Sequence, residues 1–216
     1  MTISYAVTVC NEIEEVKRLL DILFKNISEN DEIVVLVDTK NSTSEVENYI
    51  SSLTGTPNFK WAGVLFNNDF ASFKNKLKSL CTKDYIFQID ADEIISEFMI
   101  ELLPQILDAN PGLECASVPR IITVEGLTQD HVNRWGWIVN ENGWVNFPDF
   151  QMRILKNIDK IKWENKVHER LVGFAAHAFL PYDKPEWCLL HPKTIEKQER
   201  AVKLYQEINP EVREKL

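Results

Sequence analysis

The sequence is poor in the features that mark several common protein classes. Only seven of its 216 residues are glycine, and the turn after the first apolar segment, residues 11–15, contains none. A dehydrogenase would carry Gly-x-Gly-x-x-Gly at this point, and a sugar-phosphate nucleotidyltransferase would carry a Gly-rich loop with Lys or Arg for a triphosphate. The four cysteines stand far apart and show no paired metal-ligand spacing. These absences argue against both enzyme classes and against a cysteine-based metal site.

A basic surface is also missing. The chain has 24 Lys and Arg against 33 Asp and Glu, a formal net charge of −9, which argues against a nucleic-acid partner. A substrate that carries phosphates would therefore need a metal ion or a few local Lys and Arg side chains. Neither a basic leader nor a long apolar run follows Met1, so we expect no signal peptide and no integral membrane segment. Unpaired cysteines suit a reducing compartment, and we expect a cytoplasmic protein, with a peripheral position at a membrane as the alternative.

Apolar segments of strand length alternate with segments of helical periodicity over the first half of the chain. Strands are expected at 3–10, 32–38, 59–66 and 85–90, and helices at 13–27, after the polar loop 38–44, and at 70–80. This rhythm predicts an α/β fold, a Rossmann-like, doubly wound mixed sheet with helices on both faces.

The pattern changes after a helix expected at 97–109. A strand at 115–124 leads into an aromatic-rich stretch, 125–150, which we expect to form a small subregion beside the sheet. Short strands are expected at 151–155, 162–163 and 187–192, the last stopped by Pro192, before a helix at 194–208. Neither a repeat nor a linker divides the chain, so we expect a single domain, 1–216, with halves 1–95 and 96–216.

Acidic side chains gather where the expected strands end. The strand that closes the first half runs into Asp90, Asp92 and Glu93, and Asn11 and Asp38 follow two other strands. In such sheets ligands bind beyond the carboxyl ends of the strands. Residues two apart in a strand share a side, so Asp90 and Asp92 are expected to converge, and a hard divalent cation would relieve their repulsion. The alternative is an acidic first turn of a helix, above all for Glu93.

Seven segments carry further motif-like residues: Val7–Glu12, Val34–Asp38 with Asn41–Thr43, Asn68–Asn75, Asp90–Glu93, Pro148–Arg153, Trp163 with Val167–Glu169, and His191 with the helix that ends near Tyr205. In this order they resemble the family 2 glycosyltransferases of the GT-A fold, most of all the small subgroup that adds sugars to lipopolysaccharide cores and similar acceptors. There are two departures: Thr-Lys-Asn-Ser follows Asp38 where Asp-(Gly/Asn)-Ser is commoner, and Lys74 stands where Arg is usual.

The resemblance implies a metal-dependent, inverting, hexosyltransferase-type enzyme. Its donor would be a UDP- or GDP-sugar, and its acceptor a hydroxyl of a glycan, a lipopolysaccharide-like molecule or a protein. Mn²⁺ or Mg²⁺ would bridge the donor's phosphates. Asp92 would ligate the metal directly, Asp90 would contact the ribose or reach the metal through water, and His191 would complete the coordination. The alternative for His191 is packing ahead of Pro192.

The same resemblance implies donor-binding roles for Asn11, Glu12, Asp38, Asp69, Lys74, Asp90, Ala91 and Arg153. Each of these has a plainer alternative. Asp38 is also a typical turn residue, and Asp69 with Lys74 could form an ordinary surface pair. Arg153 could form a structural ion pair with an acid such as Asp149.

An inverting transfer needs a base that takes the proton of the acceptor hydroxyl. Glu169 is the first choice and Asp149 the second, the alternative being that His168 and Glu169 together orient a loop. One of Trp135, Trp137 and Trp144 is expected to stack on a sugar, while the others supply core area. The competing hypothesis for the whole chain is a non-catalytic binding module with the same fold.

Overall fold

Strands and helices alternate through the first half of the chain as the periodicity predicts. The computed structural model describes residues 1–210. The elements of the first half are β1 (Ile3–Val9), α1 (Ile13–Asn26), β2 (Glu32–Asp38), α2 (Ser44–Ser52), β3 (Phe59–Val64), α3 (Phe70–Lys78) and β4 (Tyr85–Asp90). All of these lie within a few residues of the expected positions.

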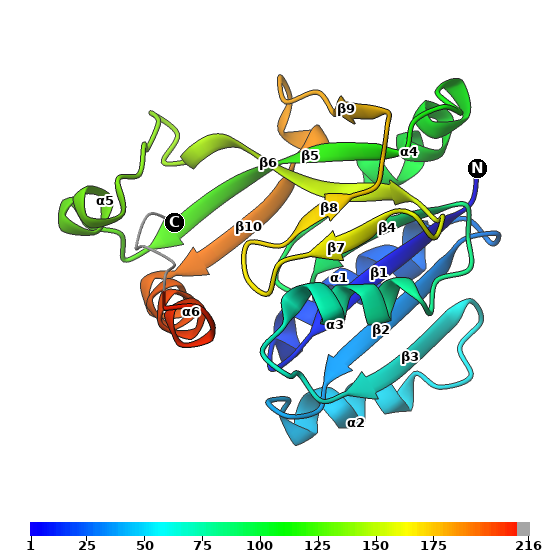
Figure 1. Cartoon of the computed structure of the whole chain (residues 1–216), viewed down its shortest axis with the longest axis horizontal. Helices are drawn as coiled ribbons and strands as arrows, with labels where there is room; N and C mark the ends of the chain where they lie inside the picture. The colour runs from blue at the N-terminus through cyan, green and yellow to red at the C-terminus, as the bar shows by residue number, and fades with distance from the viewer. Residues whose placement is uncertain (211–216) are drawn as a thin grey trace.

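The second half adds a long antiparallel pair of strands and a closing helix. Its elements are α4 (Glu97–Ala109), β5 (Cys115–Glu125), α5 (Gln129–Trp135), β6 (Val145–Lys156), β7 (Lys162–Glu164), β8 (Arg170–Val172), β9 (His177–Phe179), the 3₁₀ turn η1 (Pro185–Trp187), β10 (Leu189–Thr194) and α6 (Ile195–Ile208). Figure 1 shows β5 and β6 extending beyond the parallel strands towards α5.

Within residues 1–210 the main sheet has eight strands, seven of them in the order β10-β5-β6-β4-β1-β2-β3, with β9 paired to β5. Strands β4, β1, β2 and β3 are parallel, whereas β6 runs antiparallel to both β4 and β5. The hairpin of β7 and β8 stands apart from this sheet. The antiparallel β6 therefore brings side chains of the second half to the carboxyl end of β4.

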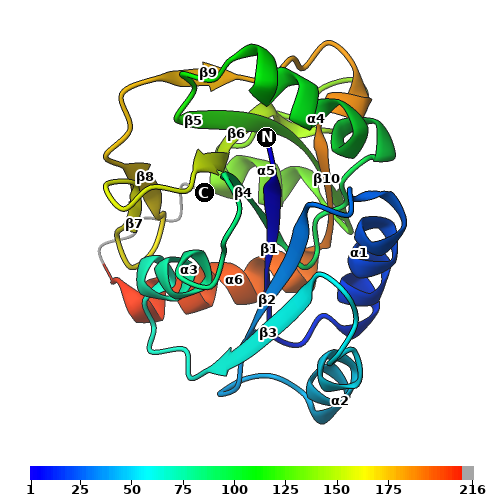
Figure 2. The same ribbon diagram turned by 90° about the vertical axis from the view of Figure 1, so that its right-hand side faces the viewer.

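Helices cover both faces of the sheet, as predicted (Figure 2). On β1, Tyr5 and Val7 point into the core beneath α1, α2 and α4, while Ala6 packs on the α3 side with the hairpin of β7 and β8. Strand β2 is buried along its whole length, which explains its continuous apolar sequence. Among residues 1–210, no helix is both long and apolar enough to cross a membrane.

The second half contains one helix that was not expected and one strand that is longer than expected. The stretch 125–150 contains α5 and the first residues of β6. A capping box between Thr128 and His131 starts α5, and Gly136, with φ of 65°, ends it. Pro192 does not stop β10, which continues to Thr194. Strand β10 is at the edge of the sheet, where a residue without an N–H is tolerated.

Candidate active site

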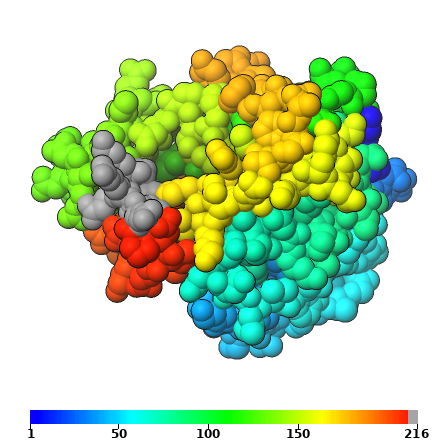
Figure 3. Space-filling view, in the orientation of Figure 1, coloured from blue at the N-terminus to red at the C-terminus, as the bar shows by residue number. Residues whose placement is uncertain are grey.

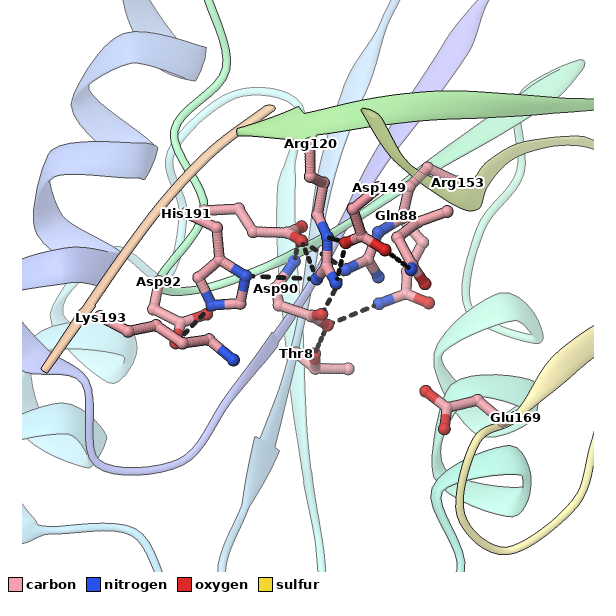
Figure 4. Close-up of polar contacts among 12 residues, drawn as sticks. Thr8, Gln88, Asp90, Asp92, Arg120, Asp149, Arg153, Glu169, His191 and Lys193 are labelled. Atoms are coloured by element: carbon pink, nitrogen blue, oxygen red, sulfur yellow. Dashed lines mark hydrogen bonds and ion pairs between the residues drawn. The ribbon is translucent and has the colours of Figure 1, made fainter. Parts of the chain in front are cut away.

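The carboxylate of Asp90, at the carboxyl end of β4, is held on both oxygens by the protein (Figure 4). Its Oδ2 accepts a hydrogen bond from Nη2 of Arg153 at 2.5 Å. Its Oδ1 accepts from the hydroxyl of Thr8 at 3.1 Å and from Nε2 of Gln88 at 3.0 Å. The ammonium of Lys74 lies 4.0 Å from the same oxygen. Asp90 is thus fixed in place by residues from four elements or their ends.

Glu93 extends this arrangement into the interior as a buried ion network. Its side chain is completely buried and accepts hydrogen bonds from Arg153 and, at 3.0 Å, from Nη1 of Arg120. Arg120 also pairs with Asp149, with Nη2 2.6 Å from Oδ2. The second oxygen of Glu93 accepts the backbone N–H of Asp90 at 3.0 Å. Glu93 therefore does not form an acidic first turn of a helix, since α4 begins four residues later.

The charges of this network stabilise one another. Burial raises the pKa of Asp90, but the positive charges of Arg153 and Lys74 and the hydrogen bond from Arg153 outweigh it and hold that pKa well below its usual value. Burial lowers the pKa of Arg153, and the negative charges of Asp90 and Glu93 more than reverse this. The negative charges of Asp90 and Glu93 are thus balanced by side chains of the protein itself, Arg153 and Lys74.

Asp92 lies in the turn after β4 and faces β10 rather than β6 (Figure 4). Its Oδ2 is 3.2 Å from Nε2 of His191, an ion-pair distance without hydrogen-bond geometry. On the other side of the ring, Nη1 of Arg120 is 3.2 Å from Nδ1. Arginine can only donate, so Nδ1 must accept, and in the neutral ring the proton is on Nε2. Burial raises the pKa of Asp92, whereas His191 and Lys193 lower it, with a net decrease.

The donor set at this site fits a metal ion only in part. Among residues 1–210, no group of three or more His, Cys, Asp and Glu side chains is arranged to hold one. Strand β4 ends at Asp90, so Asp92 lies in the turn beyond it, and the strand periodicity on which the expected convergence rested does not extend to Asp92. Asp92 keeps 24% of its side chain exposed. Asp90 keeps 29% exposed, and two partly exposed carboxylates suit an ion that takes most of its ligands from substrate phosphates.

Asp38 lies at the end of β2, where it was expected, but its oxygens are engaged with the backbone and side chains around it. It accepts from the N–H of Lys40 at 2.9 Å, from Nδ2 of Asn41 at 2.8 Å and from the N–H of Phe66 at 3.2 Å. These bonds hold the loop after β2 against the segment after β3. This geometry agrees with the alternative of a turn-forming aspartate.

Other predicted donor-binding residues also shape the backbone at this edge. Glu12 accepts the N–H groups of Cys10 at 2.9 Å and Asn11 at 3.0 Å, and Asp69 caps the first turn of α3. Ala91 is buried, and its N–H donates to a carbonyl of β1 at 3.1 Å. Asn11 itself is exposed, next to the ends of β1 and β2.

Lys74 joins α3 to the second half of the chain. It forms an ion pair with Glu169, and its ammonium lies 4.8 Å from the ring centroid of Trp163. The alternative of a surface pair between Asp69 and Lys74 is therefore wrong, since Lys74 is buried and has other partners. Arg153 does form a structural ion pair, the alternative considered for it, but with Asp90 and Glu93, since Arg120 pairs with Asp149.

Helix α6 packs beside the segment that carries Glu169. The ring of Tyr205 on α6 is 5.6 Å from His168 and 5.8 Å from Phe70. Figure 3 shows this helix, in red, against the yellow segment of β7 and β8. Burial first, and then the charges of Glu169 and Asp90, raise the pKa of Tyr205 to about 12. Its hydroxyl is therefore protonated at neutral pH.

Two of the three tryptophans considered for sugar stacking are core residues. Trp135 and Trp137 are buried, with ring centroids 4.6 Å apart, in a small cluster with Val202 of α6. Trp144 is half-buried and packs on Phe147, with centroids 4.8 Å apart. Of the three, only Trp144 has a substantial exposed surface.

Comparison with known proteins now gives the family. The sequence profile described as "Glycosyl transferase family 2" matches residues 4–175, most of the chain. The chain belongs to glycosyl transferase family 2. No curated protein matches its sequence.

Solved structures support the fold of this family 2 member. The chain superposes on TarS 1–349 of S. aureus with a TM-score of 0.57 and 15% identity, covering 99% of this chain and 67% of that one. Superposition on the complex of TarS 1–349 with UDP-GlcNAc gives a TM-score of 0.52 and 14% identity, covering 99% of this chain and 68% of that one. The chain spans only 41% of the longer TarS structure, at a TM-score of 0.55 and 15% identity. The expected GT-A fold is confirmed.

Sequence reasoning on this family 2 glycosyltransferase missed several residues of the site. Arg120 is central to the ion network, and Gln88 and Lys193 flank the two aspartates. A charged or amide side chain inside an apolar strand was the available signal for Arg120 and Gln88. Lys193 carried no such signal, because it lies in a polar stretch. Glu93 was noticed as an acid after the strand, but its pairing with two arginines was not expected.

Proposed function

We propose that this family 2 glycosyltransferase moves a sugar, with inversion and with the help of Mn²⁺ or Mg²⁺, from a UDP- or GDP-sugar to a hydroxyl acceptor. The accessible Asp92 beside the fixed Asp90, at the carboxyl ends of β1 and β4, carries the proposal. A UDP-GlcNAc complex of TarS, which has the same fold, favours a uridine nucleotide. The acceptor would be a glycan, a lipopolysaccharide-like molecule or a protein. The four cysteines, all without disulfides, support a reducing compartment such as the cytoplasm, including its membrane surface.

The metal ion would bridge the two donor phosphates and act as a Lewis acid on the leaving group. Asp92 would hold it, and Asp90, fixed by Arg153, would orient the ribose or an ion-bound water. His191 could ligate the ion through Nε2 only after its ring nitrogens change roles, because Arg120 now faces Nδ1. Until then His191 positions Asp92. Around the nucleotide, the exposed Asn11 and the backbone held by Glu12, Asp38, Asp69 and Ala91 would form the rim of the site.

Glu169 is the proposed base. Its side chain, 16% exposed, is held by Lys74. As the acceptor oxygen attacks the anomeric carbon, Glu169 would take the hydroxyl proton. Asp149 is the second candidate, but its carboxylate forms an ion pair with the guanidinium group of Arg120. Its first role would be to hold Arg120.

The donor site is tested by calorimetric titration of UDP and GDP, with and without Mn²⁺, into the wild type and Asp92→Ala. We expect metal-dependent binding of one nucleotide, lost in the variant. A matched control is Glu14→Ala, an exposed residue on α1 that pairs with Lys17, and it should bind as the wild type does. Binding of neither nucleotide at millimolar concentration would refute the proposed donor.

A measurement of donor turnover distinguishes a glycosyltransferase from a non-catalytic binding module with the same fold. Release of UDP or GDP from a panel of nucleotide sugars, with water as the only acceptor, needs no knowledge of the natural acceptor. Slow release in the wild type that disappears in Asp92→Ala is the expected result. Tight binding of a nucleotide sugar without any release, in water or with a panel of glycan acceptors, would favour the non-catalytic module.

A further inference from the structure

Lys193 is a cation of the site whose ammonium contacts an amide rather than a carboxylate. It follows His191 by two residues on β10, and Figure 4 shows its side chain beside Asp92. The side chain is half-buried, and its ammonium donates a hydrogen bond to Oε1 of Gln198, on α6, at 3.2 Å. In the part of the chain that the structure describes, no carboxylate oxygen lies within 4.0 Å of this ammonium, since it takes part in none of the ion pairs there.

The other cations around the two aspartates are all paired. Arg153 binds Asp90 and Glu93, and Arg120 binds Glu93 and Asp149. Lys74 binds Glu169, and Lys197, at the start of α6, binds Glu15 of α1. Recruiting any of these four to a ligand would break an existing ion pair. The ammonium of Lys193 can donate three hydrogen bonds, so it could bind a phosphate oxygen without breaking an ion pair and while keeping its bond to Gln198.

We propose that Lys193 binds the diphosphate of the donor and stabilises the charge of the departing nucleoside diphosphate, a role that rests on the proposed function. In the transfer, the bond from the anomeric carbon to the diphosphate oxygen breaks, and both of its electrons leave with that oxygen. A new bond forms from the acceptor oxygen to the anomeric carbon, and the hydroxyl proton goes to Glu169. The negative charge that appears on the diphosphate is met by the ammonium of Lys193.

The position of Lys193 suits this role for two reasons. It lies next to Asp92, the residue proposed to hold the phosphate-bridging ion, so that both would act on the same phosphates. It is also anchored by Gln198 rather than free in solvent, which reduces the conformational entropy lost when a phosphate binds. A half-buried ammonium interacts more strongly with a phosphate than an exposed one, because the local dielectric constant is lower.

The test compares the affinities for UDP and UMP, and for GDP and GMP, in the presence of Mn²⁺. The variants are Lys193→Met, Lys193→Arg and, as a matched control on the exposed side of α6, Lys203→Met. A charge-assisted hydrogen bond to the second phosphate predicts that Lys193→Met loses about 10- to 100-fold in affinity for the diphosphate. The affinity for the monophosphate should change much less. Lys193→Arg should recover most of the loss, and Lys203→Met should match the wild type.

The outcomes separate this role from the proposed function. If the wild type binds UDP or GDP and Lys193→Met, folded as judged by its thermal unfolding, binds it equally well, Lys193 has no such role and the donor site stands. An equal loss for diphosphate and monophosphate, or an equal loss in Lys203→Met, would also overturn the role. If the wild type binds neither nucleotide, the proposed function and the role of Lys193 fall together.

Discussion

Replacing Glu93 by glutamine should destabilise the protein far more than the loss of an ordinary ion pair. Glu93 is fully buried and accepts hydrogen bonds from Arg153 and Arg120. Glutamine keeps the shape of the side chain but removes its negative charge, so that the guanidinium groups of Arg120 and Arg153 lose a buried counter-charge. Removing one partner of a buried ion pair costs about 3–5 kcal/mol. Asp90 and Asp149 still pair with the arginines, so we expect the lower end, about 3 kcal/mol.

The measurement is urea unfolding at pH 7, followed by tryptophan fluorescence and by far-UV circular dichroism. We expect a lower midpoint with an unchanged slope, since the unfolded surface is the same. Glu14→Gln, at the exposed pair with Lys17, serves as the control and should leave the midpoint in place. A loss below about 1 kcal/mol in Glu93→Gln, the range of surface pairs, would show that the network is not the buried, mutually dependent cluster described above.

Three further outcomes follow from the same network. The pKa of Asp90 is lower in the folded state than its unfolded-state value of about 3.9. The ionised carboxylate therefore stabilises the protein above that pH, and this stabilisation is lost as the pH falls through the folded-state pKa. The urea midpoint of Asp90→Asn should fall less between pH 5 and pH 2 than that of the wild type. Long-range ¹H–¹⁵N spectra should show neutral His191 with its proton on Nε2, and a proton on Nδ1 would contradict the contact with Arg120. Glu169→Gln should lower kcat by about 10²- to 10⁴-fold with little change in donor KM, and a larger loss of kcat in Asp149→Asn would assign the base to Asp149 instead.

The fold of the first half was predictable because its segments are regular and locally determined. Strand β2 is apolar between Glu32 and Asp38 because both of its faces are covered, and α1 shows one buried stripe that includes Val16 and Leu20. In the second half, β6 was recognised only from its last residues, since its first part carries Pro148 and polar side chains that face the site. The alternation of apolar and polar residues does not reveal a strand where polar side chains occupy it for reasons of function.

The sequence indicated which residues lie near one another at the candidate site better than it indicated which of them form contacts. Asp90, Asp92, Arg153 and His191 do lie together. The pairing of Arg120 with both Glu93 and Asp149 was not predictable, because it depends on the register of β5 against β6 and on the turn after β4. Such register is a tertiary property, and one residue of slip would place Arg120 on the other face of the sheet.

The ion network also bears on how the chain must fold. Its carboxylates Asp90 and Glu93 come from the first half, while Arg120 and Arg153 come from the second, 27 to 63 residues later. Among residues 1–95, only Lys74, at 4.0 Å, pairs with Asp90, and no Lys or Arg pairs with the buried Glu93, whose unpaired charge would be costly in the interior. We therefore expect a fragment of residues 1–95 to stay unfolded alone and to gain structure only when residues 96–216 are added. The site and the union of the two halves would form in a single cooperative step.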